Sequence, residues 1–197
     1  RFCMSANRAF CQLAYQLFYP AILGSIIFDL ADPFRNVTII WVCSLMIGLC
    51  FVVDYLHLTL NLWPDGEPTN LVFEPFLDIV IAFLFCVSYF AIARTGAPNF
   101  PQEQVLYNVK VCLGCLFATH VLIVIYDLGV GKLSSFADLV PLAISGAGFV
   151  CALYYGATYD PFVVTVIVTS MVFITYLARV VFTVKRKSIA RATATVI

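Results

Sequence analysis

Six ionisable side chains lie within or beside the long apolar stretches of this sequence, where they could do chemistry. They are Asp54, His57, Glu74, Asp78, His120 and Arg179. Charged groups in hydrocarbon are costly, and those that occur usually face a protein interior or water and belong to ion pathways or helix contacts. We therefore treat these six residues as a candidate buried polar layer.

The spacing of the acidic residues and one histidine suggests that they act in pairs. Asp54 and His57 are three residues apart, and Glu74 and Asp78 are four residues apart. Residues at these separations share one face of a helix. The polar hairpin 61–70 joins the two stretches. Each pair can therefore point at one partner near the same end of a helical hairpin.

Two chemistries fit this layer. In a structural interpretation Arg179 neutralises Asp54 or Asp78, and His120 forms a hydrogen bond across helices, so that the network fixes helix register. In a transport interpretation the carboxylates and imidazoles form a proton or cation pathway, since these are the groups of relays and ion sites in membranes. Both interpretations use the same residues, and the sequence favours the structural one.

A metal or haem centre is the third chemistry that these residue types allow. His57 and His120 could in principle be paired axial ligands to a haem, and imidazole and carboxylate groups bind several metals. However, two separated histidines match no recognised ligand spacing. We therefore expect neither a bound metal nor another cofactor.

The composition places these residues in a membrane protein. Of the residues 62% are hydrophobic and only 11% are charged, and the mean hydropathy is +0.99. Soluble domains contain about 25% charged residues. The formal net charge is zero and no basic stripe is present. This charge pattern argues against nucleic-acid binding, which requires a basic surface.

The apolar windows predict an all-helical bundle of six transmembrane helices that forms one domain over residues 1–197. The spans are about 10–30, 37–60, 71–93, 105–126, 136–157 and 162–184. Each is long enough to cross about 30 Å of hydrocarbon as a helix. Residues 185–197 form a basic tail that we expect to lie against anionic lipid through Lys185, Arg186, Lys187 and Arg191.

The distribution of basic residues predicts the orientation. With six spans, seven lysine and arginine residues lie on the side of the two termini, and three lie on the opposite side. Cytoplasmic loops are enriched in such residues. Both termini are therefore expected in the cytoplasm.

Two short sequence matches suggest an inverted repeat of three helices plus three. Phe28-Asp29-Leu30 resembles Tyr126-Asp127-Leu128 at the ends of the first and fourth spans, and Glu74-Pro75-Phe76 resembles Asp160-Pro161-Phe162 at the starts of the third and sixth. Repeats of this kind occur in many transporters.

The remaining motifs give no sign of catalysis. Most of the eight cysteines lie in apolar stretches and are expected to be packing residues, including the pair Cys112 and Cys115. No nucleotide-binding loop, nucleophile elbow or zinc-protease motif is present. We expect a non-enzymatic structural or accessory subunit that packs with lipid and with other membrane proteins or copies of itself. The alternative is a small channel or transporter for protons or cations.

Overall fold

The computed structural model describes residues 17–32, 38–62, 74–129, 136–156 and 158–194. Throughout these ranges the regular structure is helical, as the sequence predicts, and no strand occurs in them. The elements are α2 (Tyr19–Leu30), α3 (Ile39–Leu62), α4 (Glu74–Ala93), η2 (Arg94–Gly96), α5 (Gln102–Gly129), α6 (Phe136–Tyr155) and α7 (Pro161–Ala194).

Four of these helices are long and apolar enough to cross a membrane. Their apolar windows are Ile39–Leu56, Phe76–Gly96, Gln102–Ile125 and Pro161–Ala178. Two shorter apolar helices, Tyr19–Leu30 and Leu139–Tyr155, accompany them. The described chain is thus a helical bundle with several candidate membrane spans.

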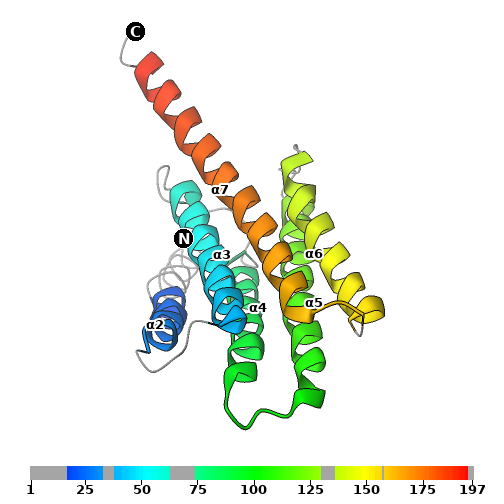
Figure 1. Cartoon of the computed structure of the whole chain (residues 1–197). Coiled ribbons are helices and arrows are strands. Elements are labelled where there is room, and N and C mark those ends of the chain that lie inside the picture. The colour runs from blue at the N-terminus through cyan, green and yellow to red at the C-terminus, as the bar shows by residue number, and fades with distance from the viewer. Residues whose placement is uncertain (1–16, 33–37, 63–73, 130–135, 157, 195–197) are drawn as a thin grey trace.

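The long helices form a closed bundle, and α2 lies outside it (Figure 1). Consecutive helices from α3 to α7 pack side by side, and α7 also packs on α3. Helix α2 contacts α3 and α4. The first described helix is therefore attached to one side of the bundle.

This packing does not confirm the inverted repeat. A pseudo-twofold axis that exchanges the first three helices with the last three would exchange the α3–α7 contact with a contact between α6 and α4. The described contacts of α6 are instead mainly with α5 and α7. The matching tripeptides at the span ends are adequately explained by the frequency of aspartate and proline at helix termini.

Helices α3 and α7 run parallel in a fixed register. The thiol of Cys43 contacts the carbonyl of Phe162, and the thiol of Cys50 contacts the carbonyl of Thr169, each with an S···O distance of 3.4 Å. The two contacts are seven residues apart on both helices. A seven-residue repeat of contacts is typical of two helices packed at a small angle.

Helix α7 begins at a clear sequence signal and extends beyond the predicted span. The Asp160 carboxylate accepts hydrogen bonds from the backbone N–H groups of Phe162 and Val163, at 2.8 and 3.4 Å, and Pro161 occupies the first helical position. Both features favour a helix start. The helix continues to Ala194 and projects from the bundle (Figure 1), so the basic segment 185–194 belongs to it.

Glycines on α5 and α6 allow these helices to pack closely. The ring of Phe149 lies over Gly114, where an added Cβ would approach it to 3.1 Å, and the ring of Phe117 lies over Gly146 at the same distance. The two rings stack with centroids 6.1 Å apart. We call these four residues the Gly-Phe seam. Each helix supplies one phenylalanine ring and one glycine that receives the ring of the other helix, as expected for close packing of membrane helices.

Candidate functional site

Three residues of the predicted polar layer have described side chains, and all three are buried. Asp54 on α3, Asp78 on α4 and His120 on α5 are 8%, 7% and 2% exposed. Aspartate is rarely buried to this degree unless it is paired. The side chains of the other three, His57, Glu74 and Arg179, lie outside the described part, so the structure does not test Arg179 as a counter-charge.

Tyr19 of α2 connects two of these acidic positions. Its side chain is fully buried, and its hydroxyl donates a hydrogen bond to the backbone carbonyl of Asp78 at 3.1 Å. The carboxylates of Asp54 and Asp78 both lie close enough to act electrostatically on this hydroxyl. Tyr19 therefore brings together groups from α2, α3 and α4.

Aromatic rings enclose the Tyr19 side chain. Its ring stacks on Phe51 and on Tyr55 of α3, with centroid distances of 5.3 and 5.2 Å. Phe51 in turn makes an edge contact with Phe85 of α4, with centroids 5.8 Å apart. These arrangements are the ones that aromatic pairs prefer. The phenol hydroxyl is thus held in place by an apolar wall.

The partners of His120 determine its tautomer. Its Nδ1 lies 2.7 Å from the backbone carbonyl of Leu116, and a carbonyl can only accept, so Nδ1 carries a hydrogen. Its Nε2 lies 2.9 Å from the Tyr176 hydroxyl. In the neutral imidazole Nε2 is therefore the acceptor and Tyr176 the donor. This bond joins α5 to α7.

Tyr176 completes a polar cluster, which we define as Tyr19, Asp54, Asp78, His120 and Tyr176. Tyr176 is 4% exposed and lies within electrostatic range of Tyr19. The 119-residue offset between α3 and α7 puts Asp54 level with Phe173, about one turn from Tyr176. The cluster therefore takes one side chain from each of five helices.

Sequence reasoning did not identify the two tyrosines of the cluster. Tyrosine near the end of a span is usually assigned to the membrane interface. However, Tyr176 lies eight residues before the predicted end of its span at 184, a depth close to that of the predicted layer. Counting depth for every hydroxyl, and not only for charged groups, would have identified it.

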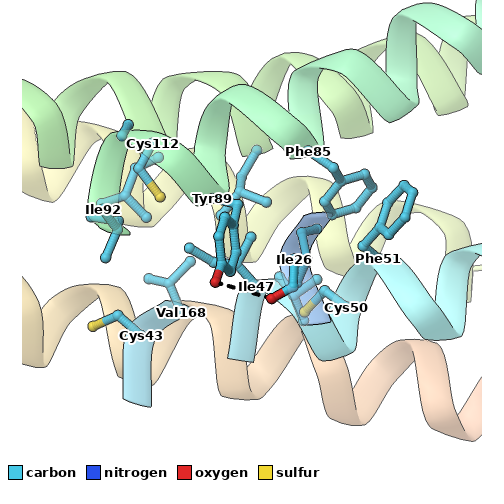
Figure 2. Packing of buried hydrophobic residues seen from close by; sticks show 14 of the residues in the cluster. Ile26, Cys43, Ile47, Cys50, Phe51, Phe85, Tyr89, Ile92, Cys112 and Val168 are labelled. Atoms are coloured by element: carbon cyan, nitrogen blue, oxygen red, sulfur yellow. Dashed lines mark hydrogen bonds between the residues drawn. The ribbon is translucent and has the colours of Figure 1, made fainter. Parts of the chain in front are cut away.

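A second polar contact fixes the other end of α2. The Tyr89 hydroxyl of α4 donates a 2.6 Å hydrogen bond to the carboxylate of Asp29 and also approaches the Ile26 carbonyl at 3.5 Å, as Figure 2 shows for the latter. The indole N–H of Trp41 contacts the carbonyl of Leu30 at 3.4 Å. Tyr19, at the start of α2, bonds to Asp78 near the start of α4, and Asp29, near the end of α2, bonds to Tyr89 near the end of α4. The two helices therefore run parallel.

The described side chains do not gather into a metal site. Within the described ranges no group of three or more histidine, cysteine or acidic side chains is arranged to hold an ion. Cys112 is buried on α5 and Cys115 is partly buried, and both are thiols. Cys112 also belongs to the core drawn in Figure 2. Its backbone carbonyl accepts a hydrogen bond from the Ser88 hydroxyl at 3.2 Å.

No protein-family model, curated protein or solved structure matches this chain. The chemistry of the polar cluster must therefore be argued from its own residues. They can join helices through hydrogen bonds, and they can hold a proton, because carboxylate, imidazole and phenol groups all exchange one.

Proposed function

We propose that this protein is a non-enzymatic membrane protein with six spans that serves as a structural or accessory subunit. It would pack with lipid and with other membrane proteins or copies of itself. The observation that supports this most directly is that buried polar groups bond to groups on other helices of the same chain. Three such bonds are Tyr19 to Asp78, His120 to Tyr176 and Tyr89 to Asp29.

These bonds suit a structural role because they specify helix positions. Interhelical hydrogen bonds in membranes contribute about 0.6 to 2 kcal/mol each. They add modestly to stability, but each forms in only one arrangement of the helices. A bundle fixed in this way presents a constant outer surface to its membrane partners.

The direction of the helices supports a sixfold crossing. Helices α3 and α7 run parallel, and α4 and α5 between them both have the length of a span. If α4 and α5 cross the membrane and α6 does not, α7 begins on the side where α3 ends. It would then run antiparallel to α3. A crossing by α6 resolves this difference. The parallel course of α2 and α4 favours a crossing by α2 as well.

Reconstitution and native mass spectrometry test the proposed role together. In proteoliposomes under proton, sodium and potassium gradients, we expect flux no greater than in protein-free vesicles. In nanodiscs drawn directly from membranes, we expect a second copy or another membrane protein at fixed stoichiometry. Flux above background, or a monomer accompanied by lipid alone, would contradict the proposal.

A second candidate function is a small channel or transporter for protons or cations. The specific observation in its favour is that two carboxylates, an imidazole and two phenols gather in one cluster across five helices. In this case Asp78→Asn should abolish flux while the melting temperature stays within a few degrees of the wild type, because the Tyr19 bond is to the Asp78 backbone and survives the change. Flux that persists in Asp78→Asn would exclude this use of the cluster.

A further inference from the structure

We infer that the polar cluster is a proton-binding site, in which Nε2 of His120 takes up the proton and the hydrogen bond to Tyr176 reverses. This inference goes beyond the structural role and requires no flux across the membrane. It follows from the partners of the imidazole, the chemistry of a phenol hydroxyl and the presence of two carboxylates in the same cluster.

The first step is that only one ring nitrogen can change its state. Nδ1 of His120 is committed as a donor to the Leu116 carbonyl at 2.7 Å. That carbonyl lies on the preceding turn of the same helix, so the bond does not depend on helix packing. An added proton must therefore go to Nε2, which in the neutral ring accepts from Tyr176.

The second step is that Tyr176 can adapt to a protonated ring. A phenol hydroxyl both donates and accepts. When Nε2 gains a hydrogen and becomes the donor, the Tyr176 oxygen can accept, and its own hydrogen is released to turn toward another acceptor. A main-chain carbonyl or a phenylalanine at this position could not make both arrangements. The 2.9 Å contact can thus be kept in both protonation states.

The third step is that the cluster supplies negative charge for a buried imidazolium. An isolated charge at 2% exposure would be very costly, whereas a nearby carboxylate favours the charged form. Tyr19 lies within electrostatic range of Asp54, Asp78 and Tyr176. Tyr176, the partner of His120, and both carboxylates thus lie near the same Tyr19 hydroxyl, and a proton on His120 lowers the net negative charge of the whole cluster.

Other titratable groups lie on the helices that pack against the cluster. Helix α3 also supplies Cys50 and Tyr55, and the side chains described on α6 include the titratable residues Cys151, Tyr154 and Tyr155 near its far end. Asp127 on α5 and Asp138 near the start of α6 also lie on these helices, with side chains outside the described part. His57, Glu74 and Arg179 occupy neighbouring positions on α3, α4 and α7, with side chains outside the described part. Because these groups also titrate, the experiment must measure the protonation of the His120 ring itself and not a bulk property of the protein.

Nuclear magnetic resonance of protein labelled with ¹⁵N-histidine tests the inference in nanodiscs. The chain contains two histidines, so His57→Gln leaves His120 as the single labelled residue. We expect Nδ1 to stay protonated throughout and Nε2 to become protonated as the pH falls, with one midpoint between about pH 5 and pH 9. Nε2 that stays unprotonated over this range, or Nδ1 that loses its hydrogen, would overturn the inference.

Carboxylate variants then test the electrostatic coupling. Replacing both acids, Asp54→Asn with Asp78→Asn, should lower the midpoint of Nε2 by at least about 1 pH unit, since the imidazolium loses its compensating charge. The matched control is Asp29→Asn, which removes the carboxylate bonded to Tyr89 at the other end of α2 and should leave the midpoint unchanged.

The single variants keep the test decisive if the double variant does not fold. At least one of the variants Asp54→Asn and Asp78→Asn should lower the midpoint, whereas Asp29→Asn should not. If both single variants match the control, the carboxylates do not compensate the imidazolium and the inference fails. The flux measurement above is separate, so a protein without transport can still pass this test.

Discussion

The Gly-Phe seam and the polar cluster join helices of the same bundle by opposite means. In the seam, Gly114 and Gly146 receive the rings of Phe149 and Phe117, and no polar group takes part. In the cluster, helices meet through hydroxyl, imidazole and carboxylate groups, as in the bond between His120 and Tyr176.

This difference shows how the two kinds of contact divide the work in a membrane. Lipid tails are as apolar as the side chains, so burial of apolar surface between helices gives little driving force, and close packing and polar bonds must provide it. Shape fixes the seam, and a mismatch there is a steric clash. Hydrogen bonds fix the helices at the cluster, so a substitution there removes a directional bond or changes the charge.

The largest effect is expected where a glycine on α6 meets a stiff side chain on α7. A Cβ at Gly148 would overlap Cγ2 of Val168, and valine has little freedom to rotate away. Gly148→Ala should therefore lower the free energy of unfolding by about 1 to 3 kcal/mol, measured by denaturation in mild detergent.

Two variants control this prediction. Gly24→Ala adds the same methyl group where nothing lies within 4 Å and should not destabilise the protein. Adding Val168→Ala to Gly148→Ala should restore part of the loss, because it makes room for the new methyl group. Helix propensity favours alanine over glycine at both sites, so equal stabilities for Gly24→Ala and Gly148→Ala would show that the contact with Val168 carries no cost.

A smaller effect is expected in the seam itself. An added Cβ at Gly114 or Gly146 would come within 3.1 Å of a phenylalanine ring, which can move by a few tenths of an ångström. Each alanine variant should cost about 1 kcal/mol. The two together should deviate from additivity, because the two rings stack on each other. Strict additivity in a double-mutant cycle would show that the two sites act independently.

Loss of a single interhelical bond should cost a similar or smaller amount. Tyr89→Phe removes the 2.6 Å bond to Asp29 and should lower stability by about 0.6 kcal/mol, the average for hydrogen bonds between membrane helices. The same change at Tyr107, which is 68% exposed, serves as the control and should have no measurable effect. Equal melting temperatures for the two variants would show that the α2 contact adds nothing to stability.

The smallest effect is expected at the thiols between α3 and α7. Cys50→Ser keeps a donor for the Thr169 carbonyl and should change stability by about 0.5 kcal/mol or less. Cys50→Val fills the site without a donor and should be less stable than Cys50→Ser. The reverse order in the same unfolding assay would mean that apolar packing, and not the thiol bond, determines this contact.

Local composition was sufficient to predict much of the architecture. The length and hydropathy of the windows predicted every α-helix of the described ranges, and the helix starts at Asp160-Pro161 and near Glu74-Pro75 agree with the predicted spans to within a few residues. The end of α7 was missed, because the residues after 184 are polar but include good helix formers, which let a helix continue beyond the hydrocarbon.

The candidate site was only partly accessible from the sequence. Charge in an apolar stretch marked Asp54, Asp78 and His120, because the cost of burying charge depends on the residue and its depth alone. Tyr19 and Tyr176 carry no such signal, since tyrosine is tolerated in many membrane positions.

What the sequence by itself determined is the set of helices, their apolar character and the presence of buried acidic and imidazole groups. The tertiary structure decided which groups meet: Tyr176 with His120, Tyr19 with Asp78, and α7 with α3 in a parallel register. The physical reason is that hydropathy is a property of each segment, whereas a contact depends on the rotation and height of two helices. Those are fixed only when glycine surfaces, aromatic rings and polar bonds from several segments fit together at once.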